Sequence, residues 1–228
     1  EKWSEIHALA NRQAVTGILF DAVTKLPAGN GLPMNLAAKW LVETQKIERR
    51  NEQIGKVIDA QKKAWDRSGI DAVLMKGHSV AALYPIPEHR ACGDIDWYFP
   101  APGDWEKANA IAKKNGMDLK TDSDGDVHYT FANVVVEHHH EGRRQDSPVD
   151  VIVMLVEHVL HHAMVMGVGM KQVADVAAAY RFYDGKYDKA ELDNALEKEG
   201  LLKWDRLLRK VIPQVDEPDV KVLTDLIL

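Results

Sequence analysis

The chain has 228 residues, 46% of them hydrophobic and 28% charged, a composition typical of a soluble globular protein with one large core or two small ones. Its formal net charge of -6 argues against a protein whose main partner is duplex nucleic acid, because binding by counterion release needs a basic face. The single cysteine, Cys92, excludes an internal disulfide, and no stretch approaches the roughly 18 to 20 apolar residues that span a bilayer, so we expect a cytoplasmic protein without a membrane span.

The first part of the chain has the spacing of helices. Apolar residues recur at helical positions over about 3–20 and again over 35–68. A cluster of prolines and glycines at 27–33 separates the two runs. We therefore expect an N-terminal helical region over residues 1–68.

Residues 69–142 alternate between strand and helix patterns. The predicted strands are 72–75, 95–99, 127–131 and 134–139, and the predicted helices are 79–84 and 105–114. The last two strands should form a hairpin that turns at Ala132 and Asn133. This order predicts a mixed α/β core and places the chain in the α+β fold class.

Beyond Gly142 the pattern returns to helix. The predicted helices are 149–166, 170–183, 189–198 and 201–211, with glycines between them. We expect a C-terminal helical region over residues 143–228, which short linkers should hold against the α/β core.

Three acidic residues lie in the strands of the predicted core. Asp94 and Asp96 are two residues apart and so point to the same face of their strand, where two like charges need a positive counter-charge. Trp97 should point away from them into the packed side. Glu137 is in the last core strand, which can lie beside the strand of the aspartates. Oxygen ligands of this kind suit Mg²⁺ or Mn²⁺, and two such ions can activate an attacking oxygen and stabilise a departing pyrophosphate.

The motifs around these acids resemble those of a known family. They are Leu74-Met-Lys-Gly77, Tyr84-Pro85, Arg90, Gly93-Asp-Ile-Asp96, Val136-Glu-His138, His158-Val-Leu-His-His162, Gly167-Val-Gly-Met-Lys-Gln172 and Asp175. With them the chain resembles the DNA polymerase beta-like nucleotidyltransferase superfamily and, more closely, an uncharacterised bacterial nucleotidyltransferase-like family. The resemblance implies a polymerase beta-type sheet core flanked by helical regions.

The resemblance also implies an activity. The protein would move a nucleoside monophosphate from an NTP to a hydroxyl of an acceptor, which could be a small molecule, a sugar, a protein or an RNA end. Asp94 and Asp96 would hold two Mg²⁺ or Mn²⁺ ions, and Glu137 would complete the metal site nearest the attacking oxygen. The residues expected to bind substrate are Lys76, Gly77, His78, Arg90, Gly93 and Lys171.

His78 departs from the superfamily pattern, which has a small residue directly after the turn glycine. Its ring could donate a hydrogen bond to a phosphate oxygen, as an enzyme would require. It could instead crowd the triphosphate, and the chain would then be a non-catalytic nucleotide-binding module or a toxin-antitoxin component on the same fold.

Several histidines raise a zinc alternative. They occur at 138–140 and, with helical spacing, at 158, 161 and 162. No cysteine accompanies them and no His-Glu-x-x-His motif occurs, so zinc hydrolysis is the weaker interpretation. We expect His161 or His162 to pack against the core or to line a nucleotide cleft with Lys171. In the alternative interpretation, Lys171 and Asp175 form an ion pair on a solvated helix face.

Overall fold

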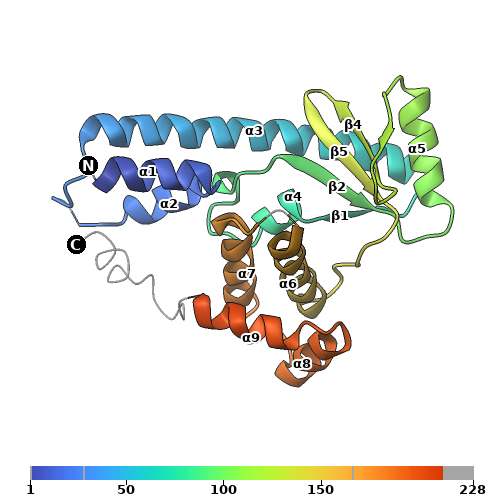
Figure 1. The fold of residues 1–228 in the computed structure, drawn as a ribbon. Coiled ribbons are helices and arrows are strands. Elements are labelled where there is room, and N and C mark those ends of the chain that lie inside the picture. Colours follow the sequence, from blue (N-terminus) through green and yellow to red (C-terminus); the bar gives the residue numbers. More distant parts are fainter. Residues whose placement is uncertain (1, 28, 166, 213–228) are drawn as a thin grey trace. The chain divides into compact units, whose positions relative to one another are not determined.

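The computed structural model describes residues 2–27, 29–165 and 167–212, in which helices and strands are mixed (Figure 1). A sheet unit contains Arg49–Ala82 and Cys92–Asp146, and a helical unit contains Leu83–Ala91 with the described residues up to Glu48 and from Ser147 onward. This division differs from the three consecutive segments expected, because α3 (Met34–Arg67) contributes residues to both units.

The sheet unit is built on five strands in the order β1-β2-β5-β4-β3. Their bounds are β1 Val73–Met75, β2 Asp94–Tyr98, β3 Lys120–Thr121, β4 Val127–Phe131 and β5 Val134–His139. Strands β2 and β5 are parallel and the other neighbouring pairs are antiparallel. The predicted mixture of strand and helix is confirmed, and so is the hairpin that turns at Ala132 and Asn133, both of which have positive φ. The two-residue edge strand β3 was not predicted.

The register of β2 against β5 separates the sheet into two chemically different faces. Asp94 lies opposite Val135 and Asp96 lies opposite Glu137. Alternation therefore places both aspartates on the face of Glu137 and turns Trp97 to the other face, where it is 2% exposed. The expected inward orientation of Trp97 is confirmed.

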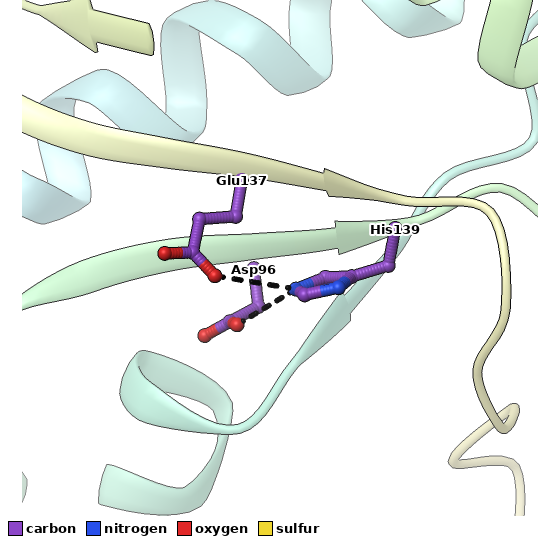
Figure 2. A group of neighbouring side chains, drawn as sticks. All are labelled: Asp96, Glu137 and His139. Carbon is purple, nitrogen blue, oxygen red and sulfur yellow. Dashed lines mark hydrogen bonds and ion pairs between the residues drawn. The ribbon is translucent and has the colours of Figure 1, made fainter. Parts of the chain in front are cut away.

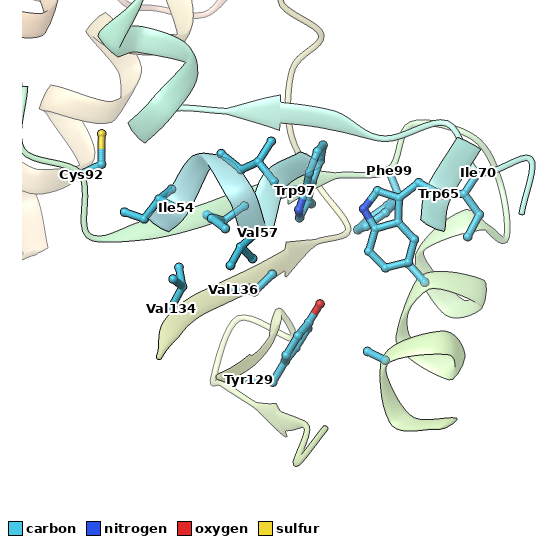
Figure 3. Close-up of a cluster of buried hydrophobic side chains, with 14 of the residues drawn as sticks. Ile54, Val57, Trp65, Ile70, Cys92, Trp97, Phe99, Tyr129, Val134 and Val136 are labelled. Atoms are coloured by element: carbon cyan, nitrogen blue, oxygen red, sulfur yellow. The ribbon is translucent and has the colours of Figure 1, made fainter. Parts of the chain in front are cut away.

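The apolar face of the sheet is covered by α3 and by α5 (Asp104–Lys114) (Figure 3). The core takes Ile54, Val57, Ile58 and Trp65 from α3, Ala108 and Ala112 from α5, and Ile95, Trp97, Tyr129, Val134 and Val136 from the strands. Burial of these side chains fixes the register, because a slip of one residue would exchange the two faces.

A chain of buried hydrogen bonds crosses this core. Trp97 Nε1 donates to Gln61 Oε1 at 2.9 Å, and Gln61 Nε2 donates to the Tyr129 hydroxyl at 2.8 Å. The Tyr129 hydroxyl lies 3.1 Å from Nε2 of His138, whose Nδ1 lies 2.8 Å from Asn109 Oδ1. Burial lowers the pKa of His138 to about 3, so the neutral ring can donate from Nδ1 and accept at Nε2.

The helical unit contains the first half of α3 and a set of shorter helices. These are α1 Lys2–Arg12, α2 Thr16–Val23, the 3-10 helix η1 Pro87–His89, α6 Pro148–Val165, α7 Met170–Phe182, α8 Lys189–Lys198 and α9 Leu202–Val211. The run expected to be helical over 3–20 is two helices, because Ala14 between them adopts a φ of 55°. Met166, the predicted end of α6, lies outside the described residues.

Helix α6 corrects the expectation that no stretch approaches the length of a membrane span. It has 18 residues with a mean hydropathy of 1.4, which is long and apolar enough to cross a bilayer by length and composition. However, 44% of that stretch is buried inside the fold, and α6 packs against α7, α8 and α9. A buried core helix meets the same criteria, so this single helix is weak evidence for a span.

The buried hydrogen-bond chain predicts the effect of removing one hydroxyl. Tyr129→Phe should lower the free energy of unfolding by about 2 kcal/mol, because His138 and Gln61 would each lose a buried partner. Tyr98→Phe is the matched control, since the Tyr98 hydroxyl has no hydrogen bond to any described residue, and it should change stability by less than about 0.5 kcal/mol. If urea denaturation showed equal losses of stability in the two variants, the buried hydrogen bonds of Tyr129 would have no stabilising role.

Candidate metal centre

Three side chains converge on the polar face of the sheet: Asp96 from β2, and Glu137 and His139 from β5 (Figure 2). One carboxylate oxygen of each acid and a ring nitrogen of His139 all lie within 4.8 Å of one another. His139 Nε2 is 2.9 Å from Asp96 Oδ1 and 3.7 Å from Glu137 Oε2. The parallel pairing of β2 and β5 produces this convergence and confirms that the strand of Glu137 lies beside that of the aspartates.

Asp94 lies on the same face, one pleat before Asp96. It is not one of the three residues whose possible ligand atoms lie within 4.8 Å of one another, but its charge acts on Glu137. Burial, followed by the charges of Asp96 and Asp94, raises the pKa of Glu137. The three predicted carboxylates thus interact with one another, while their predicted roles as metal ligands stay predictions.

Cationic side chains compensate Asp96, which is more deeply buried than Asp94 or Glu137. Asp96 is 4% exposed, and its Oδ1 accepts from Lys76 Nζ at 3.1 Å as well as facing His139. Burial alone would raise the pKa of Asp96, but the hydrogen bond from His139 and the charges of Lys76 and His139 outweigh burial and lower it. Burial would lower the pKa of His139, yet its hydrogen bond to Asp96 raises it overall.

Lys76 has a backbone conformation that residues other than glycine rarely adopt. It lies between β1 and α4 (Gly77–Ala81) with φ 50° and ψ -146°, a region occupied mainly by glycine. The next residue, Gly77, has a φ of 27°, and a Cβ there would lie 3.4 Å from the Asp94 carbonyl oxygen. This tight turn brings the Lys76 ammonium to Asp96.

The start of β2 and the tip of the hairpin are held by α3. Arg50 NH2 donates to the Gly93 carbonyl at 3.1 Å, and its NH1 donates to the Asn133 carbonyl at 2.8 Å. Gly93, predicted to bind substrate, thus has an observed contact that positions the strand of the aspartates. The ring of His78 lies beside α3, because a Cβ on Gly55 would be 3.7 Å from His78 Cε1. Its predicted contact with phosphate stays a prediction.

Two predicted substrate-binding residues belong to the helical unit. Arg90 Nε and NH2 donate to the two carboxylate oxygens of Asp175 at 2.8 and 2.7 Å, and the Tyr84 hydroxyl donates to the same carboxylate at 2.8 Å. Because Asp175 is 2% exposed, the interpretation that it pairs with Lys171 on a solvated face is wrong. Phosphate binding by Arg90 and by Lys171 stays a prediction.

Sequence reasoning missed His139 as a member of the site. Strand alternation already placed it on the side of Glu137, but its two neighbouring histidines suggested a zinc cluster. The structure separates the three, because His138 is in the core and His140 contacts Asp126 outside it. Two carboxylates and one imidazole nitrogen are a plausible ligand set for a divalent ion, so the donor types at this site fit the predicted metal.

Of the comparisons with known proteins, the one with protein families found a match. The model of a family described as uncharacterised nucleotidyltransferase matches residues 1–146, which include Asp94, Asp96, Glu137 and His139. No curated protein and no solved structure matches the chain.

The raised pKa of Glu137 predicts a pH-dependent loss of stability in the metal-free protein. Because the folded state disfavours the carboxylate, ionisation of Glu137 lowers the free energy of unfolding. This loss is absent below the unfolded pKa of about 4.3, grows as pH rises above it, and is complete above the folded pKa. Glu137→Gln should therefore stabilise the metal-free protein at pH 7, by less than about 1 kcal/mol since the side chain is 36% exposed and solvent screens it. Thermal melts in EDTA at pH 7 and pH 4 measure this difference, and a gain that persists undiminished at pH 4 would disprove the electrostatic cause.

The backbone conformation of Lys76 predicts that glycine is more stable than alanine at this position, the reverse of the usual order in a helix. Lys76→Gly and Lys76→Ala both remove the ammonium group, but only glycine relieves the backbone, so the glycine variant should be more stable by about 1 to 2 kcal/mol. At Lys63, an exposed position inside α3, the same pair should show the ordinary order, with alanine more stable by about 0.5 to 1 kcal/mol. Chemical denaturation of the four variants gives both differences. Alanine more stable than glycine at position 76, by the same margin as at the control position, would mean that no strain is held there.

Proposed function

Since the chain belongs to the uncharacterised nucleotidyltransferase family, we propose that it transfers a nucleoside monophosphate from an NTP to a hydroxyl of an acceptor. In this reaction the hydroxyl loses its proton to solvent and its oxygen forms a bond to the α-phosphorus. The bond from that phosphorus to the bridging oxygen breaks, and pyrophosphate leaves. The sheet unit would be a polymerase beta-type core, and the reaction would take place in the cytoplasm.

One observation supports this proposal most: two carboxylates on adjacent parallel strands face each other, and a lysine and a histidine offset their charge. Asp96 is kept ionised at a nearly dry position, where its interaction with a cation is strong. An ordinary surface acid needs neither this burial nor these partners. The arrangement therefore suits the binding of a cation and a polyphosphate more than solubility alone.

Each residue has a chemical task in the proposed site. Asp94, Asp96 and Glu137 would hold Mg²⁺ or Mn²⁺, which when bound would neutralise phosphate charge and lower the pKa of the attacking hydroxyl. Lys76 would move from Asp96 to the negative charge that develops on the phosphates. The missing side chain of Gly77 would let phosphate oxygens approach the backbone.

A non-catalytic nucleotide-binding module is the second candidate, and the presence of His78 in place of a small residue favours it. Both candidates predict binding of NTP with a divalent ion, measured as a rise in melting temperature with each NTP in the presence and absence of Mg²⁺. Only the enzyme predicts pyrophosphate release. Binding without release, with every class of acceptor supplied, would favour the module.

Asp96→Asn tests the enzyme directly. Loss of one charge from the site should reduce nucleotidyl transfer by a factor on the order of 10³, because the lost interaction stabilises the transition state and packing cannot replace it. The measurements are pyrophosphate release and transfer of α-phosphate label from each NTP, with small-molecule, protein and RNA fractions of a cell extract as acceptors.

The matched control for this variant is Asp118→Asn, which removes an exposed acid from the loop before β3. It should leave transfer within twofold of the wild type, and both variants should keep the native circular dichroism spectrum. Transfer by Asp96→Asn at the wild-type rate would contradict the proposed function.

A further inference from the structure

We propose that Asp126 is a positioning residue that aims His139 at the metal centre, and that the resulting nitrogen ligand makes the site prefer a divalent transition-metal ion such as Mn²⁺ to Mg²⁺. This inference rests on the proposed function, because it concerns the same metal centre. It adds a ligand that the motif of two aspartates and a glutamate lacks, and a residue that sequence analysis did not assign to the site.

Asp126 holds the end of β5 with both of its carboxylate oxygens. It lies directly before β4, and its Oδ2 accepts from His139 Nδ1 at 2.6 Å. Its Oδ1 accepts from the backbone nitrogen of His140 at 3.2 Å and faces His140 Nδ1 at 2.9 Å. The Trp105 indole fixes the same end of the strand by donating to the His138 carbonyl at 3.0 Å. The His139 ring thus has a fixed orientation.

The contact with Asp126 determines which nitrogen of His139 faces the site. An aspartate can only accept, so the Nδ1 atom carries a proton and donates it to Asp126. Nε2 is then the nitrogen directed at Asp96 and Glu137, at 2.9 and 3.7 Å. A carboxylate that accepts from one nitrogen of a histidine while the other binds metal is a recurrent arrangement, because it fixes the ring and increases its basicity as a ligand.

An imidazole ligand changes which ions the site favours. Mg²⁺ prefers oxygen ligands in a near-ideal octahedron and retains its waters, so a nitrogen adds little to its affinity. First-row transition ions accept imidazole readily, together with carboxylates. The group formed by Asp96, Glu137 and His139 therefore favours Mn²⁺ over Mg²⁺ more than three carboxylates would.

The test measures the metal itself. Calorimetry with Mn²⁺ alone and Mg²⁺ alone gives the ratio of the two affinities, and pulsed electron paramagnetic resonance of bound Mn²⁺ detects magnetic coupling to a directly bound ¹⁴N. The wild type should show this coupling and a preference for Mn²⁺. His139→Ala should abolish the coupling and reduce the preference for Mn²⁺, because the imidazole nitrogen would be lost from the ligand set.

Three further variants separate positioning from general stability. Asp126→Ala removes the acceptor of His139 and should weaken the coupling and the preference, whereas Asp126→Asn keeps an oxygen acceptor and should restore most of both. His140→Ala removes the other partner of Asp126 and should leave both readouts unchanged. Circular dichroism checks that each variant folds, and Asp126→Asn and His139→Ala remain informative if Asp126→Ala does not.

The outcomes distinguish the inference from the proposed function. Bound Mn²⁺ without ¹⁴N coupling in the wild type would overturn the inference and leave an oxygen-only nucleotidyltransferase site. Unchanged coupling and preference in a folded Asp126→Ala variant would overturn the role of Asp126. Coupling and preference as expected, without transfer from any NTP, would support the inference and contradict the proposed function.

Discussion

The parallel register of β2 against β5 is the constraint on which the rest of the site depends. It places Asp96 opposite Glu137 and Trp97 opposite His138, so one pairing sets both the polar and the apolar face. A shift by one residue would bury two aspartates beneath α3 and expose the tryptophan, at a cost of several kcal/mol. The apolar residues of the covered face therefore stabilise this register, although they lie on the face opposite the acids.

The two faces solve the problem of buried polar groups in different ways. On the covered face, Trp97, Gln61, Tyr129 and His138 satisfy one another through neutral hydrogen bonds. On the site face, acids are offset by Lys76 and His139, and the compensation is incomplete at Glu137, whose pKa is raised. Burial, together with the charges of Asp96 and Asp94, thus leaves the Glu137 carboxylate less favourable than it would be in water.

The backbone beside the acids contains two consecutive residues with positive φ. Lys76 occupies a conformation suited to glycine, and Gly77 follows in a turn pressed against the carbonyl of Asp94. Strain of this kind persists only where surrounding contacts enforce it, and it accompanies function more often than stability. Arg50 supports the same region from α3 by holding the carbonyls of Gly93 and Asn133. The sheet unit thus fixes both the acids and the lysine that faces them.

The sequence by itself determined most of the elements and which acids share a face of their strand. Local periodicity defines the strands, the hairpin and most of the helices, and alternation places Asp94 with Asp96 and Glu137 with His139, because these rules act over a few residues. Only the tertiary structure decided that β5 lies parallel to β2, that Asp126 contacts His139, and that Asp175 pairs with Arg90, 85 residues away, and not with Lys171. These contacts join segments distant in sequence, and their partners are chosen by packing and charge in the folded chain, which no local pattern records.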